Sequence, residues 1–278
     1  MADPAGMLEL LALPSLQRAL LAGLISGALG GVLGSFAVLR QLAFFGETLG
    51  HACLLGLTAG ILLGLDPTLL LLPFAVLFAI AVHHLSRGSR LPADALLNIL
   101  HSSCLALAVL ALSRLRSFQG SLERLLFGDI LGVSWLDLGL MLALAVGALI
   151  YLLLSSRSQI LLSLDRDLAI ASGVRTEWHQ LALLVVLAVV VAVSIKAVGV
   201  LLISAFLVIP ASASRLVSGR FDRYVLLAAL LGAGTAVLGL LGSAAFDLPS
   251  GPSVVVTQLL AFLGALVLAA GRGRSRGA

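Results

Sequence analysis

Two ionisable residues lie four positions apart at the start of a long apolar stretch, an unusual place for charge. Glu47 and His51 sit within residues 44–56 (FFGETLGHACLLG), and the apolar run continues to Leu65. On an α-helix this spacing places both side chains on one face. A carboxylate and an imidazole are ligands that suit a first-row divalent metal ion. If the stretch spans a membrane, such residues are costly to bury and typically mark a transport pathway or a proton relay.

The composition indicates that the stretch does span a membrane. The chain has 278 residues, of which 60% are hydrophobic and 11% charged, and its mean hydropathy is +1.17. Soluble domains carry roughly 25% charged residues. Several apolar runs exceed about 18 residues, the usual length of a spanning helix, and they lack the alternation of a membrane β-barrel. The sequence therefore predicts an all-α polytopic membrane protein with about eight to nine transmembrane helices.

Nine candidate spans can be marked along the chain. They are residues 17–39, 42–65, 67–85, 93–113, 133–155, 179–196, 197–214, 223–246 and 252–271. As one helix, residues 179–214 would extend about 54 Å, against a hydrocarbon core of about 30 Å. We therefore expect this stretch to bend or to cross twice, with Gly199 or Pro210 available to break it.

The arginines indicate the orientation. Nine crossings with the N-terminus outside put most of them in the cytoplasm, as the positive-inside rule requires. Eight crossings with the N-terminus inside satisfy the rule less well, so we expect nine. The chain is read as a single transmembrane domain over 1–278, with its membrane bundle at 15–271. Two longer polar segments remain, 114–132 outside and 156–178 in the cytoplasm.

The cytoplasmic segment 156–178 has the features of a short helix. Asp165 can cap its start and Gly173 can end it, with Asp167 and Ala169 between them. A short helix with a polar face is suited to docking a partner, and an ordinary connecting loop is the alternative.

Other polar residues in the apolar runs have simpler interpretations. His83 and His84 are expected to be solvated at a membrane end. Lys196, the only lysine, is expected near the outer end of a span, where it snorkels or pairs with a carboxylate. Cys53 and Cys104 are expected to pack, with nothing to support a disulfide.

Several function classes lack their sequence signatures. The chain has no G-x-x-x-x-G-K-[ST] phosphate loop, no H-E-x-x-H and no G-x-S-x-G. An ATPase of that type, a zinc protease and a serine hydrolase are therefore disfavoured. Nucleic-acid binding is also disfavoured, because no stacking aromatics interleave with the basic residues.

Six stretches, in order, resemble the permease subunit of zinc/manganese/iron-type ABC importers. Besides 44–56 they are 94–107 (DALLNILHSSCLAL), 126–137 (LFGDILGVSWLD), 165–174 (DRDLAIASGV), 194–215 (SIKAVGVLLISAFLVIPASASR) and 247–253 (DLPSGPS). The chain departs from the family pattern at Glu47, where Asp is commoner, and at His101, where an apolar residue is usual. His101 could add a ligand or merely pack, and both departures bear on the choice of metal.

The resemblance implies a multi-pass permease of a prokaryotic cytoplasmic membrane, of the type II ABC importer kind. Glu47 and His51 would coordinate the transported Zn²⁺, Mn²⁺ or Fe²⁺ transiently, and no cofactor would be held permanently. Asp165, Asp167, Ala169 and Gly173 would belong to the segment that couples to the ATPase. The chain would form a homodimer, would not itself be an enzyme, and would work with two copies of an ATPase subunit and an extracytoplasmic metal-binding protein.

Three alternatives stay open at the level of sequence. A siderophore or cobalamin type of ABC permease would need no metal-ligand pair. A proton-coupled secondary carrier would use Glu47 and His51 without an ATPase. An intramembrane enzyme would use the same pair for acid–base chemistry, although protease signatures are missing.

Overall fold

The computed structural model describes residues 13–65, 67–89, 91–113 and 128–274, and within them every regular element is helical. Residues 114–127, most of the predicted external segment, lie outside this range. The elements are α2 (Pro14–Leu39), α3 (Phe45–Leu62), α4 (Pro67–Gly88), α5 (Ala93–Leu112), η1 (Ile130–Gly132), α7 (Trp135–Leu164), α8 (Arg166–Ala171), α9 (Thr176–Val198), α10 (Val200–Val217), α11 (Phe221–Phe246) and α12 (Ser250–Arg274).

Nine of the described helices are long and apolar enough to span a membrane, and they match the nine predicted spans. The doubtful stretch 179–214 divides into α9 and α10, as its length required. The break is at Gly199, whose φ of 84° is a conformation that residues with a side chain rarely adopt. Pro210 lies buried inside α10 and does not end it.

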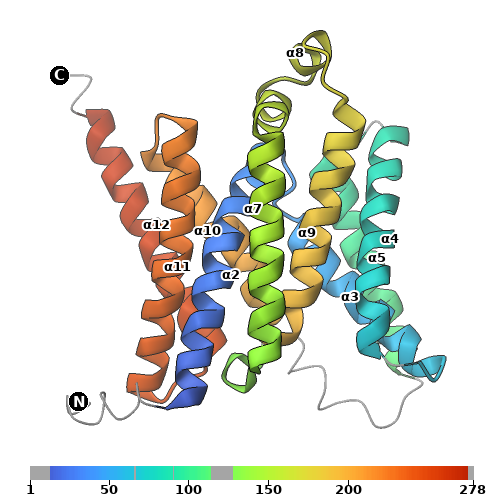
Figure 1. Cartoon of the computed structure of the whole chain (residues 1–278), viewed down its shortest axis with the longest axis vertical. Helices are drawn as coiled ribbons and strands as arrows, with labels where there is room; N and C mark the ends of the chain where they lie inside the picture. Colours follow the sequence, from blue (N-terminus) through green and yellow to red (C-terminus); the bar gives the residue numbers. More distant parts are fainter. Residues whose placement is uncertain (1–12, 66, 90, 114–127, 275–278) are drawn as a thin grey trace.

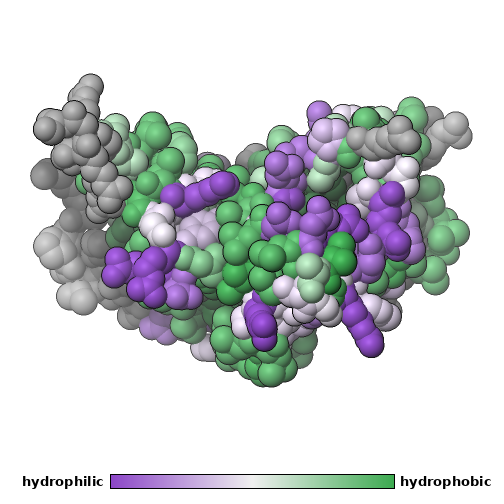
Figure 2. Space-filling view, turned by 90° about the horizontal axis from the view of Figure 1, so that it is seen from above, coloured by the Kyte–Doolittle hydropathy of each residue, from purple (hydrophilic) through white to green (hydrophobic). Residues whose placement is uncertain are grey.

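The helices run between two ends of a bundle (Figure 1). α2 begins at one end, and α12 finishes at the other, where α8 also lies. Figure 2 looks onto the α8 end and shows hydrophilic side chains gathered over it. Exposed charged residues at helix ends here include Arg87, Asp167, Arg175, Arg220 and Asp222. An odd number of crossings and a basic α8 end agree with the predicted orientation.

The segment 156–178, predicted as a loop with one short helix, is mostly helical. α7 continues to Leu164 and is about 45 Å long by its rise, so it extends beyond a bilayer core. No glycine or proline interrupts its last four turns. Arg40 donates to the backbone oxygen of Gln159 at 2.9 Å, and Gln159 donates to the backbone oxygen of His179 at 3.1 Å. These contacts with neighbouring helices hold the extension in place.

α2 is central, and it meets α11 along a seam of glycines. A Cβ atom added to Gly27 would lie 2.3 Å from the backbone oxygen of Gly232, and one added to Gly232 would lie 2.0 Å from that of Gly27. The two backbones therefore touch, as small residues permit in membrane helices. On another side, α2 packs against α10, where a Cβ on Gly34 would lie 1.8 Å from the backbone oxygen of Leu207. α10 is thereby fixed next to α3, which carries Glu47 and His51.

Candidate functional site

The predicted pair lies near the start of α3. Glu47 is in the first turn and partly exposed, whereas His51 lies about 6 Å further along the axis and is 9% exposed. Neighbouring residues fix this part of the helix. Thr48 donates its hydroxyl to the backbone oxygen of Leu97 on α5 at 3.2 Å. The pair is therefore carried by a helix that is attached to α5.

Glycines bring α10 onto the adjacent side of the same helix. A Cβ on Gly50 would lie 2.2 Å from Cγ1 of Val200, and one on Gly46 would lie 2.7 Å from Cδ1 of Leu207. Glu47 and His51 follow these two glycines by one position each, so their side chains are rotated by about 100° away from α10. The site is consequently built on a helix clamped between α10 and α5.

A backbone contact selects the tautomer of His51. Nδ1 of His51 lies 3.0 Å from the backbone oxygen of Glu47, one turn earlier. A carbonyl oxygen only accepts, so Nδ1 carries a proton, and in the neutral imidazole the lone pair is then on Nε2. Metal-ligating histidines are typically oriented by a hydrogen bond of this kind from the other ring nitrogen. The contact of His51 with the Glu47 backbone oxygen has this form.

The structure brings a third ionisable residue to this place. The ring of His101, on α5, lies against the ring of His51 with their centroids 4.4 Å apart. The sequence left open whether His101 would join the pathway, because fifty positions separate the two histidines. Only the pairing of α3 with α5 reveals that they touch.

One copy of the chain does not provide a closed metal centre. Within residues 13–65, 67–89, 91–113 and 128–274, no three His, Cys, Asp or Glu side chains stand close enough to hold a metal ion. Two free cysteines, Cys53 and Cys104, are buried in α3 and α5, as their predicted packing role requires.

The other predicted segment forms the short helix α8 at the far end of α7. Asp165 caps it by accepting from the backbone nitrogens of Asp167 and Leu168 at 2.7 and 3.2 Å. Gly173 ends it with a φ of 76°, and Ala169 is fully buried against the rest of the protein. Both predictions about the helix limits are confirmed.

α8 also exposes apolar side chains to solvent. Leu168 and Ile170 are 51% and 53% exposed, and both lie at the polar end of the bundle. Exposed apolar residues beside charged ones are typical of surfaces that bind another protein.

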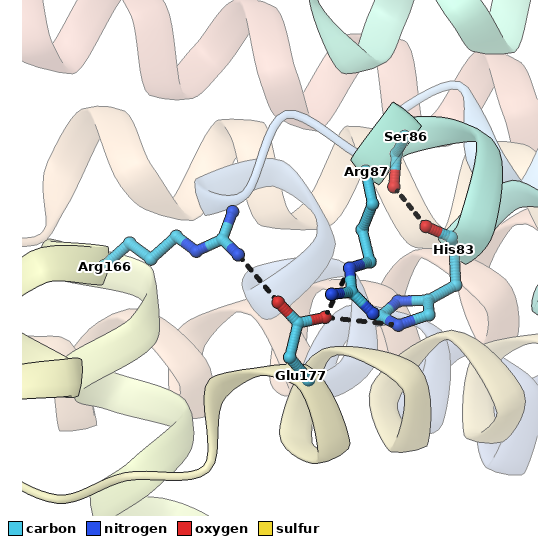
Figure 3. A network of polar contacts seen from close by, with 5 residues as sticks. All are labelled: His83, Ser86, Arg87, Arg166 and Glu177. Carbon is cyan, nitrogen blue, oxygen red and sulfur yellow. Dashed lines mark hydrogen bonds and ion pairs between the residues drawn. The ribbon is translucent and has the colours of Figure 1, made fainter. Parts of the chain in front are cut away.

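A network of ion pairs connects α8 to α4 (Figure 3), and sequence reasoning missed it. Glu177, in the first turn of α9, accepts from Arg166 of α8 at 2.9 Å and from Arg87 of α4 at 3.0 Å. Nε2 of His83 lies 3.5 Å from the same carboxylate. His83 is 3% exposed, so the prediction that it is a solvated residue was wrong. Its spacing of four from Arg87 was the available signal, because it places both on one face of α4.

We expect Glu177→Gln to loosen α8 without unfolding the protein. The substitution keeps the shape but removes the charge that holds Arg166 and Arg87. Ion pairs this exposed contribute up to about 1 kcal/mol, which corresponds to roughly fivefold faster exchange of the α8 amides. Hydrogen exchange of Leu168 to Ala171 measures this. Asp222→Asn is the matched control, since Asp222 pairs only with the exposed Arg220 at 3.8 Å and should leave α8 unchanged.

Two further basic residues are accounted for by structural contacts. Lys196 lies at the end of α9 and pairs with Asp137 of α7 at 3.3 Å, which is one of the two roles predicted for it. Arg40, just after α2, is largely enclosed by α7. Burial lowers the pKa of its guanidinium to about 10, so Arg40 stays charged at neutral pH.

Comparisons with known proteins agree with this architecture. The family described as the ABC 3 transport family matches residues 12–269. The high-affinity zinc uptake system membrane protein ZnuB of Haemophilus influenzae is 33% identical over 248 residues, which cover 88% of this chain and 94% of that protein. The manganese import system permease protein ScaB of Streptococcus gordonii is 32% identical over 250 residues, covering 89% of each.

A solved structure is similar over almost the whole chain. It is PsaBC from Streptococcus pneumoniae in complex with Fab, with a TM-score of 0.81 and 29% identity, and the match covers 95% of both chains. The described helices and their order are therefore those of a known transport architecture.

Proposed function

We propose, from the premise that this chain belongs to the ABC 3 transport family, that it forms the membrane path through which a divalent metal ion enters the cell. It is a multi-pass permease subunit of the cytoplasmic membrane. Two relatives, a zinc uptake membrane protein and a manganese import permease, match almost nine-tenths of it. The metal class of the cargo follows from these relatives, and the donor atoms at Glu47 and His51 suit it.

The single observation that carries the proposal is the environment of the His51 side chain. A nearly buried imidazole on a membrane-spanning helix has its Nδ1 held by a backbone oxygen, and a carboxylate lies one turn away. Packing alone gives no reason to place a carboxylate and an imidazole together in a span. We assign Glu47 and His51 as a transient coordination point on the path.

A second copy of the chain would complete this point. Among the described residues of one copy, no three side chains could hold a metal ion together. The transported ion therefore needs further ligands, from water or from a second protomer. A path between two protomers of a homodimer supplies both. A separate extracytoplasmic metal-binding protein would deliver the ion to the outer face, where α2 begins.

Energy would come from a separate ATPase subunit, of which two copies would bind. We place the contact on α8, whose exposed Leu168 and Ile170 stand beside Asp167. The ion-pair network through Glu177 would pass movement of α8 to α4, and α4 packs on α3. The site and the ATPase contact are then mechanically connected.

The test is metal uptake into membrane vesicles that contain this chain with its ATPase subunit. ATP on the cytoplasmic side should drive accumulation of a radioactive divalent metal, and a proton gradient without ATP should not. Uptake that follows the proton gradient would favour a secondary carrier instead. No ATP-dependent uptake of zinc, manganese or iron would end the proposal.

Charge reversal on α8 should weaken the ATPase contact. Asp167→Lys alters an exposed side chain that does not cap the helix, because the cap is the side chain of Asp165. We expect the amount of ATPase subunit that co-purifies to fall by roughly tenfold or more, because like charges brought together at an interface cost several kcal/mol. Asp222→Lys reverses another exposed charge at the same end and should leave co-purification unchanged. Equal loss in both variants would remove α8 from the interface.

A further inference from the structure

A second imidazole, that of His101, lies against His51. His101 meets His51 at an interplanar angle of 66° with 4.4 Å between ring centroids. Nδ1 of His101 is buried and has no hydrogen-bond partner among the residues that the structure describes. Leaving a buried polar atom unpaired costs about 1 to 3 kcal/mol, and such atoms in native proteins call for a reason, for example an ion that binds there.

Packing does not supply that reason. An aliphatic or phenyl side chain would fill this place on α5 without an orphaned nitrogen, and the neighbouring cysteine, Cys104, shows that apolar packing is available on this helix. If Nδ1 of His101 carries no proton, its lone pair can bind a cation. If it carried one, it would be a buried donor without an acceptor. The ring of His51, whose Nδ1 is held by the backbone oxygen of Glu47, lies beside it.

We propose that His101 is a third ligand for the transported ion and that it makes this permease select Zn²⁺ over Mn²⁺. The proposal rests on the proposed function, and it names the specificity of the same site. The rings of His51 and His101 already touch, whereas the Glu47 carboxylate has to rotate toward them, since in this conformation no three such side chains of the described residues stand close enough to hold an ion. An ion held at about 2.0 to 2.1 Å by each nitrogen needs donors roughly 3.4 Å apart in a tetrahedral site. Side-chain rotation of two rings that already touch can provide this.

The selectivity follows from the donor atoms. Imidazole nitrogen suits zinc, whereas manganese prefers carboxylate, carbonyl and water oxygens. Zinc accepts four tetrahedral ligands with nitrogen among them, so each added imidazole favours it. A site with only Glu47 and His51 would be balanced between nitrogen and oxygen. His101 shifts that balance toward nitrogen and hence toward zinc.

The experiment compares zinc with manganese in His101 variants. In the vesicle assay with both metals present, the wild-type chain should prefer zinc. His101→Leu should lower the ratio of zinc to manganese uptake by roughly tenfold or more, a loss typical of weakened ligation. His101→Cys, which keeps a zinc-binding donor, should retain the ratio. His84→Leu, at an exposed histidine on α4, is the matched control and should change nothing.

Binding provides a second readout that does not depend on transport. Equilibrium dialysis of the purified full-length chain against radioactive zinc should show weaker binding in His101→Leu and in His101→Gln, and near wild-type binding in His101→Cys. Using two variants guards against one that fails to fold. An unchanged zinc to manganese ratio with unchanged zinc binding in the Leu and Gln variants would overturn the role of His101.

The two proposals fail in different ways. If the wild-type chain takes up no metal with ATP, the proposed function is lost whatever His101 does. If the wild-type chain takes up metal and the variants keep its selectivity, only the role of His101 is lost.

Discussion

Replacing His51 by alanine is expected to reduce ATP-driven metal uptake by roughly a hundredfold or more. The variant removes the Nε2 atom that would bind the metal ion. It also removes the contact between Nδ1 and the backbone oxygen of Glu47 that orients the ring. Even residues that only orient a metal ligand are typically worth about ten- to a hundredfold in metal affinity or activity, so loss of the ligand itself should cost at least the upper figure. The measurement is the initial rate of zinc and manganese uptake into vesicles.

The design of this experiment separates the site from the fold. His84→Ala removes an exposed imidazole from α4 and should leave uptake unchanged. The His51→Ala chain should still insert and co-purify with the ATPase subunit, because α8 is remote in the sequence and rests on other contacts. Wild-type uptake rates in His51→Ala would show that the ion passes elsewhere.

Glu47 is expected to follow the same pattern with a graded response. Glu47→Gln keeps the shape and loses the negative charge, so it should be nearly as damaging as His51→Ala. Glu47→Asp keeps a carboxylate on a shorter side chain and should retain part of the activity. Asp222→Asn is the control for loss of one carboxylate at an exposed position. Full uptake activity of Glu47→Gln would show that the Glu47 carboxylate does not bind the ion and would leave His51 as the ligand.

Replacing Gly27 by alanine is expected to destabilise the protein strongly. The added Cβ would lie 2.3 Å from the backbone oxygen of Gly232, and backbone atoms cannot rotate out of the way. Overpacking in a core costs about 1 to 3 kcal/mol even where side chains can adjust, so we expect roughly 3 kcal/mol or more here. The variant should aggregate or unfold at a lower temperature during size-exclusion chromatography and thermal denaturation in detergent.

The same glycine-to-alanine substitution at Gly147, an exposed position on α7, should not destabilise the protein. Gly147 on α7 is exposed, and nothing lies within 4 Å of its added Cβ. Alanine in a helix is favoured over glycine by about 0.5 to 1 kcal/mol, so Gly147→Ala should be neutral or slightly stabilising. A Gly27→Ala chain as stable as Gly147→Ala would contradict the close contact between α2 and α11.

The sequence sufficed for the helices because each was encoded locally. A spanning helix needs about 20 apolar residues, and the composition of each run supplies them. The limits of α8 could also be predicted, since Asp165 and Gly173 act on the backbone next to them. The extension of α7 to Leu164 could not, because Arg40 and His179 stabilise it from other helices.

The four-residue spacing by itself determined that Glu47 and His51 share a helix face, because helical geometry is independent of what surrounds it. Only the tertiary structure decided what stands opposite that face. It set His101 against His51 and joined Arg166, Arg87 and His83 around Glu177. The physical reason is that helix periodicity is a local property, whereas the partners of a polar side chain depend on which helices pack together. Part of that packing is set by glycines on α2, which bring its backbone against those of α11 and α10.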